Sequence, residues 1–127
     1  MTNWLWVALG GAAGAVARYG LGLQAGRWLG HGWPYGTFIA NLTGGLLMGI
    51  LIGWLALRGG ADQERWRLLL GVGVLGGFTT FSAYSLETAL MIERREWGGA
   101  FAYAGLSAVL AIAAVFLGLW ISRKAFA

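Results

Sequence analysis

The stretch GGFTTFSAYSLE, residues 76–87, is less compatible with a plain membrane helix than any other in this chain. It lies inside an apolar segment, residues 68–91, yet it holds two adjacent glycines, two threonines, two serines and a glutamate. In hydrocarbon, each unsatisfied polar group carries a large free-energy penalty, so these groups must face protein, water or an ion. We therefore expect the other apolar segments to pack around this stretch and to shield its polar groups from lipid.

The rest of the chain has the composition of an integral membrane protein. Of its 127 residues 58% are hydrophobic and only 11% are charged. Four apolar segments fit within this length, at residues 4–23, 37–57, 68–91 and 100–121, and about 20 helical residues cross a hydrocarbon core of ~30 Å. We expect one all-α, four-helix transmembrane domain over residues 1–127, embedded in the lipid bilayer as a multi-pass protein, with the third helix broken.

The charged residues argue against a nucleic-acid partner and for an unusual topology. The basic residues flank the apolar segments and form no stripe, as nucleic-acid binding would require, and the absence of cysteine excludes thiolate metal sites. Two nearly equal sets lie on opposite sides of the membrane: Arg58, Arg65, Arg67, Arg123 and Lys124 on one, and Arg18, Arg27, Arg94 and Arg95 on the other. Because orientation follows an excess of such residues, this balance predicts insertion in both orientations, as an antiparallel homodimer requires.

Glycines recur on helix faces in two of the apolar segments. Gly10 and Gly14 form a GxxxG pair in the first, and Gly45, Gly49 and Gly53 recur every four residues in the second. Such faces let two helix backbones approach closely. We expect both faces to be helix-packing surfaces.

The glycine pair of the central stretch predicts a break in the third helix. Glycine and β-branched residues are weaker helix formers than alanine or leucine, which places the break at residues 76–79. Two interpretations stay open. The break is a kink whose backbone groups are satisfied by threonine and serine side chains, or it offers carbonyl oxygens to a hard cation, with two copies forming a cage around a twofold axis.

Polar side chains within the apolar segments outline a candidate ion path. Asn41 either makes an interhelical hydrogen bond or donates to a permeating ion, and Thr37 lies one turn earlier on the same face. Hydroxyl and aromatic residues with helical spacing are candidates to join it: Phe81 with Tyr84, Ser82 with Ser85, and Tyr103 with Ser107. A ring edge is the positive part of its quadrupole and hydroxyls donate hydrogen bonds, so together they suit a small anion.

Two charged residues of the apolar segments and one histidine have several interpretations. Arg18 is either a helix-end arginine that reaches to the membrane surface or a positive charge that concentrates anions at a vestibule. Glu87 repels anions, so it lies at the pore mouth, pairs with Arg18, or moves during gating. His31, in the connection after the first segment, is more typical of an exposed loop residue than of a metal ligand.

Three ordered motifs resemble one known family. GGAAGAVARYG in the first segment, PYGTFIANLTGG at the start of the second and GGFTTFSAYSLE in the third are similar to the Fluc (CrcB-type) dual-topology fluoride channels. The resemblance covers nearly the whole chain. It implies an antiparallel homodimer with two parallel fluoride pores, a structural sodium ion at the dimer centre, and a place in the cytoplasmic (inner) membrane.

The resemblance also implies roles for particular residues. The pore asparagine is Asn41, the first pore phenylalanine is Phe81, and Tyr84 occupies the position of the second phenylalanine, where it adds a hydroxyl. The sodium ligands are the backbone carbonyls of Gly76 and Thr79 from both subunits. Five more residues fall on or near the rows of polar side chains that line the pores of this family: Thr37, Ser82, Ser85, Tyr103 and Ser107. Arg18 matches the arginine of the first helix that lies near a vestibule.

The sequence thus predicts passive, fluoride-selective export without covalent chemistry, by a protein that is not an enzyme. The alternative is a proton-coupled exporter of the small multidrug-resistance type, which also has four short helices. That class is expected to use a carboxylate in its first helix, and this chain has none before Arg18. A third possibility is a structural subunit of a larger membrane complex, in which Asn41 and the hydroxyls only join helices.

Overall fold

The structure, a computed structural model, describes residues 2–127, and these contain helices and short turns but no strand. The long helices are α1 (Thr2–Leu29), α2 (Tyr35–Arg58) and α6 (Trp97–Phe126). Between α2 and α6 the chain forms a 3₁₀ turn (Gly60–Asp62), α3 (Gln63–Trp66), a π-helical segment (Arg67–Leu75), α4 (Gly76–Phe78) and α5 (Phe81–Glu93). Thr79 and Thr80, both extended, separate α4 from α5.

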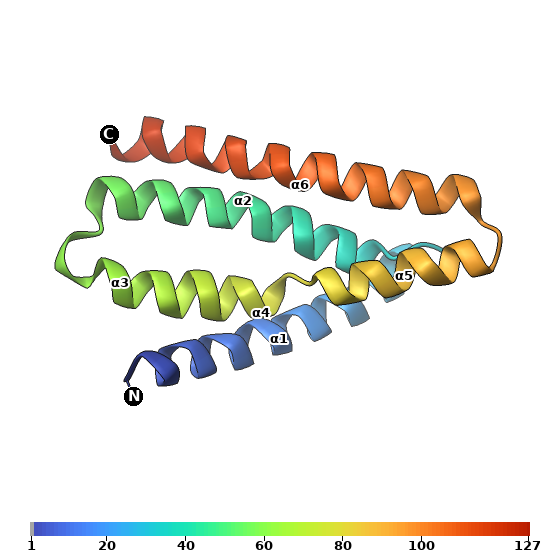
Figure 1. Ribbon diagram of the computed structural model, residues 1–127, viewed down its shortest axis with the longest axis horizontal. Coiled ribbons are helices and arrows are strands. Elements are labelled where there is room, and N and C mark those ends of the chain that lie inside the picture. The colour runs from blue at the N-terminus through green and yellow to red at the C-terminus, as the bar shows by residue number, and fades with distance from the viewer. Residues whose placement is uncertain (1) are drawn as a thin grey trace.

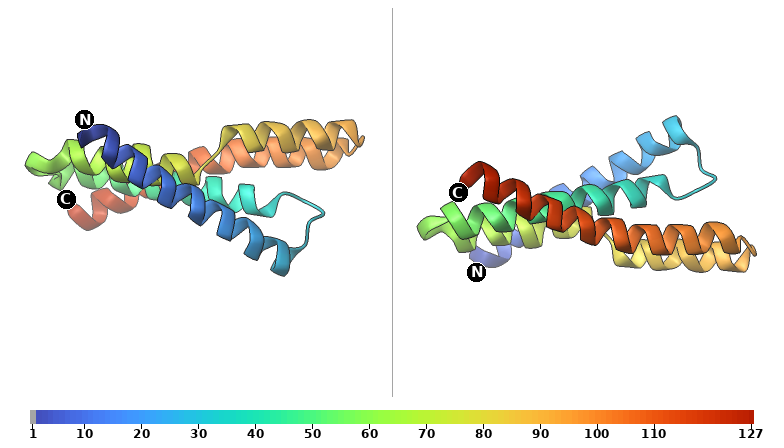
Figure 2. Two further views of the ribbon diagram at one scale, coloured as in Figure 1. Left: turned by 90° about the horizontal axis from the view of Figure 1, so that it is seen from below. Right: turned by 90° about the horizontal axis from the view of Figure 1, so that it is seen from above.

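The helices form an elongated bundle that opens at one end. α2 and α6 lie side by side over the half of the bundle that contains the C-terminus, and α1 crosses the segment from α3 to α4 (Figure 1). The start of α1 and the end of α6 lie at the same end as the turn between α2 and α3 (Figure 1). At the other end the tip of the α1–α2 hairpin separates from the tip of the α5–α6 hairpin (Figure 2).

Both glycine faces pack helices closely, as the sequence predicts. A Cβ on Gly14 would overlap the carbonyl oxygen of Val74 and lie 2.8 Å from the Phe78 nitrogen, so α1 contacts the π-helical segment and α4 backbone to backbone. On α2, a Cβ on Gly49 would overlap the carbonyl oxygen of Val115 in α6. Without side chains at these positions, backbone atoms themselves make the van der Waals contacts.

Three predicted boundaries need correction. α1 continues to Leu29, where the predicted connection was to begin at residue 24, because Gly30 is the residue that takes the left-handed conformation (φ 85°) that ends the helix. Residues 58–67, which connect the second and third predicted segments and which their charged composition predicts to be a solvated loop, are mostly exposed but largely helical. Ion pairs at i,i+3, Arg65 with Asp62 at 3.5 Å and Arg67 with Glu64 at 2.7 Å, accompany its short turns.

The interruption also lies further along than the predicted residues 76–79. Gly76 and Gly77 are helical, and the extended residues are Thr79 and Thr80. A Cβ on Gly77 would lie 3.1 Å from the Gly11 Cα, so Gly77 packs closely against α1. The glycine pair is therefore not the point at which the helix is interrupted.

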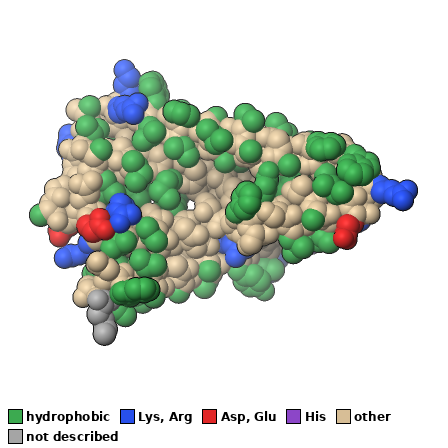
Figure 3. All heavy atoms as spheres, in the orientation of Figure 1, with side chains coloured by type: hydrophobic (Ala, Val, Ile, Leu, Met, Phe, Trp, Pro, Cys, Tyr) green, Lys and Arg blue, Asp and Glu red, His purple; other side chains and the backbone are tan. Residues whose placement is uncertain are grey.

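Three segments are long and apolar enough to cross a membrane: Tyr35–Arg58, Gly60–Glu93 and Trp97–Phe126. α1 is not among them, because its 28 residues are diluted by glycines and by Asn3, Arg18, Gln24 and Arg27. The buried core is small, with one cluster around Leu51, Leu55 and Leu75 and another around Met91, Ala100 and Tyr103. Large apolar side chains cover much of the visible surface instead, as expected of a surface that meets lipid (Figure 3).

Candidate functional site

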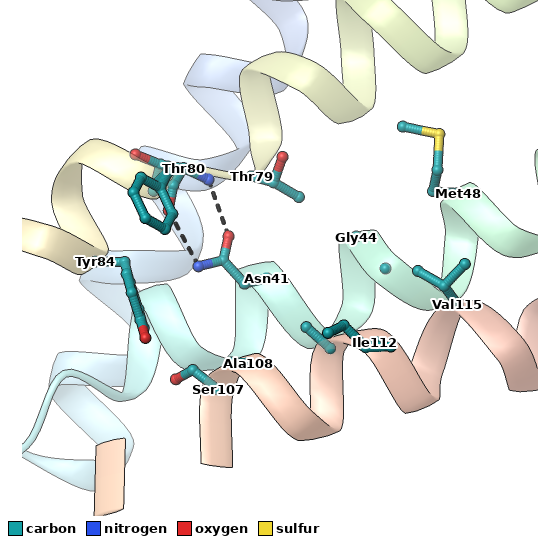
Figure 4. A pocket seen from close by; sticks show the side chains of 13 residues that line it. Asn41, Gly44, Met48, Thr79, Thr80, Tyr84, Ser107, Ala108, Ile112 and Val115 are labelled. Carbon is teal, nitrogen blue, oxygen red and sulfur yellow. Dashed lines mark hydrogen bonds between the residues drawn. The ribbon is translucent and has the colours of Figure 1, made fainter. Parts of the chain in front are cut away.

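The side chain of Asn41 binds the extended residues between α4 and α5. Its Nδ2 donates to the Thr80 carbonyl at 3.1 Å, and its Oδ1 accepts from the Thr80 N–H at 2.9 Å (Figure 4). The carboxamide thus replaces both hydrogen bonds that Thr80 would make inside a helix. This pairing gives a physical reason for the extended conformation at this point.

Threonine side chains complete both sides of the interruption. The Thr79 hydroxyl donates to the Leu75 carbonyl at 2.9 Å at the end of α4. The Thr80 hydroxyl accepts from the Ala83 N–H at 3.1 Å and so caps the N-terminus of α5. Thr80 also lines the cavity described below, and sequence reasoning did not single it out as a site residue. Its signal was a threonine three residues before Ala83 at the start of a helical stretch.

A cavity of about 400 Å³ lies beside this pairing. Its walls come from α2, α6 and the start of α5, and Asn41, Thr80, Tyr84 and Ser107 face it together (Figure 4). Most of the wall further along α2 and α6 is apolar, formed by Gly44, Gly45, Met48, Ala108, Ala111, Ile112 and Val115. The cavity therefore has a polar end at the interruption and a hydrophobic remainder.

Ser107 is the most informative residue of this cavity. Its side chain is only 3% exposed, and its Oγ has no hydrogen-bond partner within the described residues. A buried polar group without a partner carries a free-energy penalty, so such a group calls for an explanation. A hydroxyl that faces a cavity is available to donate to a small ligand with acceptor character.

Three aromatic rings lead away from the cavity. Phe81, at the start of α5, is 78% exposed, and its ring centroid lies 5.4 Å from that of Tyr84. The Tyr84 centroid in turn lies 5.4 Å from that of Tyr103, which is fully buried. The Tyr84 hydroxyl donates to the Ala104 carbonyl at 2.9 Å, so this hydroxyl ties α5 to α6.

At the far end of the aromatic row, Glu87 accepts two hydrogen bonds. Thr37 Oγ1 donates to Oε1 at 2.6 Å, and Tyr103 Oη donates to Oε2 at 3.2 Å. Thr37 and Glu87 also line a second cavity of about 210 Å³, together with His31 and the α1–α2 turn. Of the interpretations open for Glu87, pairing with Arg18 is not what the described residues show: its partners there are hydroxyls.

The predicted site residues thus fall into three groups. Asn41, Phe81, Tyr84 and Ser107 line the larger cavity, and Thr37 and Tyr103 meet at Glu87. Of the others, Thr79 lines the larger cavity at the interruption, whereas four line neither cavity: Ser82, whose Oγ is 3.2 Å from Thr80 Oγ1, exposed Ser85, Gly76 and Arg18. Arg18 keeps its Nε buried and without a partner among the described residues. No cluster of three acidic, histidine or cysteine ligands occurs in residues 2–127.

Apolar helices that lack a large core, together with a polar interruption between them, define a multi-pass α-helical membrane protein. Residues 5–119 match the family described as CrcB-like protein, Camphor Resistance (CrcB). This chain therefore belongs to the CrcB family.

Named relatives cover the whole chain. A protein of Phenylobacterium zucineum named fluoride-specific ion channel FluC is 72% identical over 97% of both chains. Proteins with the same name from a Caulobacter species and from Caulobacter vibrioides are 67% identical over 99% of this chain and 98% of theirs, and 61% identical over the full length of both. These relatives are named as ion channels, in agreement with the expectation that this chain is not an enzyme.

Proposed function

We propose that this chain forms a passive, fluoride-selective channel in the cytoplasmic membrane, where it exports fluoride. The observation that carries the proposal is the buried, unpartnered Ser107 hydroxyl facing the cavity beside Asn41 and Phe81. A buried donor suits a small anion that has lost part of its water. The names of the full-length relatives supply the identity of the anion.

The proposed path runs from the larger cavity along the aromatic row to Glu87. In the cavity, fluoride accepts hydrogen bonds from Ser107 Oγ and from the Asn41 N–H that Thr80 does not use, and meets the ring edges of Phe81 and Tyr84. At the end of the row, fluoride competes with the Glu87 carboxylate for the hydroxyl hydrogens of Thr37 and Tyr103. Passage there requires a hydroxyl to turn from the carboxylate toward the anion.

The proposed channel is an antiparallel homodimer with four spans in each chain and two pores. The third span is Gly60–Glu93, interrupted at Thr79 and Thr80, and the glycine-rich α1 supplies the fourth. The exposure of Phe81 supports a partner, because a pore-lining ring that is 78% exposed in one protomer needs a second wall. The balanced distribution of arginine and lysine supports opposite orientations of the two chains.

A sodium ion at the dimer centre fits the backbone around the interruption. In a helix, the Gly76 carbonyl would accept from the Thr80 N–H, but that N–H donates to Asn41. The carbonyls of Gly76 and Thr79, from both subunits, are the proposed ligands, and carbonyl oxygens are the ligands that hard cations prefer. The ion would join the two interruptions and neutralise their carbonyl dipoles.

No further energy source is needed for export. Hydrogen fluoride crosses the membrane as a neutral acid and ionises inside the cell. A membrane potential that is negative inside contributes about 2.3 kcal/mol per charge per 100 mV toward expulsion of the anion. A selective passive pore is therefore sufficient.

The competing proposal is a proton-coupled exporter, which needs a membrane-embedded carboxylate that binds substrate and proton in turn. α1 contains no acidic residue. Glu87 is engaged by Thr37 and Tyr103 on α2 and α6 and does not line the larger cavity. The structure therefore favours the channel.

Purified protein in liposomes separates the proposals. Vesicles loaded with potassium fluoride are diluted into fluoride-free buffer, and a fluoride electrode records efflux before and after a potassium ionophore is added. A channel gives little efflux until the ionophore carries the balancing charge, and then rapid release of fluoride; vesicles loaded with potassium chloride and measured with a chloride electrode should show no such release. Efflux that needs no ionophore and follows a proton gradient identifies a coupled exporter, whereas absence of efflux identifies a structural subunit.

The Tyr84 hydroxyl gives a second test, because this chain carries tyrosine where phenylalanine is the expected pore residue. Its hydrogen is committed to the Ala104 carbonyl, so it is not available to fluoride. In Tyr84→Phe we expect efflux within about twofold of wild type and a loss of about 0.6 kcal/mol of stability, typical of one hydrogen bond between membrane helices. The measurements are ionophore-triggered efflux and thermal stability in detergent. A tenfold change in efflux would mean that the hydroxyl acts on the anion.

A further inference from the structure

One end of the bundle carries more positive charge than its own carboxylates neutralise. Arg58, Arg65, Arg67, Arg123 and Lys124 lie there with Asp62 and Glu64. Both acidic residues are already paired, Asp62 with Arg65 and Glu64 with Arg67. Within the described residues, Arg58, Arg123 and Lys124 have no carboxylate partner; these three form the C-terminal cationic cluster.

The members of this cluster come from two helices that end side by side. Arg58, the last residue of α2, donates through Nε to the Phe126 carbonyl of α6 at 2.9 Å. Arg123 and Lys124 lie in the last turn of α6 and are exposed. Basic side chains gather at this end of the molecular surface, near the C-terminus (Figures 1 and 3). The partial negative charge at the C-terminus of a helix favours a nearby cation. It does not cancel the full positive charge that these side chains present to the surroundings.

An apolar stripe of α6 runs directly into the cluster. Val109, Ile112, Phe116 and Trp120 follow helical spacing on one face, and all are exposed, Phe116 at 68% and Trp120 at 56%. Arg123 and Lys124 continue this face by three and four residues beyond Trp120, and Lys124 Nζ lies 6.0 Å from the Trp120 ring centroid. The order is therefore apolar side chains, then tryptophan, then cations.

That order matches the order of groups in a phospholipid. Acyl chains meet apolar side chains, tryptophan prefers the boundary, and phosphate lies at the level of arginine and lysine. Each basic residue near a negatively charged membrane surface adds to the attraction, and none of the three residues of the cluster forms an ion pair with a carboxylate among the described residues. Charge complementarity therefore selects an anionic lipid over a zwitterionic one.

We infer that the outer face of α6 and the C-terminal cationic cluster bind an anionic phospholipid, with its phosphodiester headgroup at Arg58, Arg123 and Lys124. The acyl chain lies along Phe116 and Ile112, and Trp120 contacts the junction between chain and headgroup. Arg58, Phe116, Trp120, Arg123 and Lys124 line neither cavity of the proposed ion path, and Ile112 is the one residue of this surface that also lines the larger cavity.

The test is native mass spectrometry of the purified protein with phosphatidylglycerol and phosphatidylcholine of identical acyl chains. We expect wild type to retain phosphatidylglycerol in preference, and Arg123→Gln combined with Lys124→Gln to lower that preference by about tenfold. Arg123→Lys combined with Lys124→Arg keeps the charge and should keep the preference. Arg94→Gln combined with Arg95→Gln, at the opposite end, is the matched control and should leave it unchanged.

Each other outcome overturns the inference. Equal retention of the two lipids by wild type removes the headgroup site, and an equal loss in the Arg94 and Arg95 control shows only a general effect of charge. Displacement of the lipid by millimolar inorganic phosphate would show a site for free phosphate. A change in oligomer mass without a change in lipid retention would show that a second copy covers this face.

Discussion

Asn41→Asp is expected to lower fluoride efflux by at least about 100-fold, which corresponds to ~2.7 kcal/mol on the passage of the ion. The substitution changes one NH₂ group to an oxygen and leaves the shape of the side chain nearly unchanged. One oxygen of the new carboxylate would still accept from the Thr80 N–H, but the other would face the Thr80 carbonyl, to which Asn41 donates in the wild type.

Two effects of this change add in the same direction. Two acceptors at hydrogen-bond distance repel, so Thr80 loses one of its two hydrogen bonds to residue 41 of α2. The carboxylate also places negative charge in the wall of a cavity that conducts an anion, where few groups screen it. Both raise the free energy of fluoride in the path.

Ionophore-triggered efflux from liposomes measures this effect, with Asn3→Asp as the matched control. Asn3 lies exposed in the first turn of α1, far from the cavity in sequence, so the same chemical change there should leave efflux unchanged. Elution as a single species in detergent confirms that Asn41→Asp is folded. Wild-type efflux from the folded variant would remove Asn41 from the proposed path.

Much of the helical organisation follows from composition and periodicity, because both depend on properties spread over many residues. The apolar segments, the glycine faces of α1 and α2 and the polar character of residues 76–87 could all be predicted. The end of α1 could not be placed, since Gln24 and the residues after it are compatible with helix or loop, and only the left-handed Gly30 decides. The sequence prediction placed the interruption too early, because it located the break by low helix propensity and therefore at the glycine pair.

In the candidate site, too, the residues could be predicted from the composition of their own segments, whereas their contacts with other helices could not. Asn41, Phe81, Tyr84 and Ser107 could be predicted as candidates from polar residues in apolar segments, and they line one cavity. The pairing of Asn41 with Thr80 joins residues 39 positions apart, and the partners of Glu87 come from two other helices. No spacing within a single helix reveals such contacts, so Thr80 was missed and Glu87 was left with several interpretations.

Gly14→Ala is expected to give the largest loss of stability, because at Gly14 the backbone of α1 packs closely against the π-helical segment and α4. The new methyl group would overlap the Val74 carbonyl oxygen and lie 2.8 Å from the Phe78 nitrogen. Both contacts are backbone atoms, which cannot turn away as a flexible side chain does, so α1 must move off α4. Alanine is the better helix former by about 1 kcal/mol, but overpacking of a tight contact costs up to about 3 kcal/mol.

The net result should be a loss of folded protein in detergent or a lowered thermal midpoint, measured by the fraction that elutes as a single species after heating. Gly20→Ala is the matched control, because it adds the same methyl group to the same helix where no atom lies within 4 Å. It should be as stable as wild type or more so. Equal stability of the two variants would mean that α1 does not rest on α4 at Gly14. In that event the contact between Gly14 and the Phe78 backbone would not fix the position of Thr79. The packing of α1 would then not hold the carbonyls that we propose as sodium ligands in place.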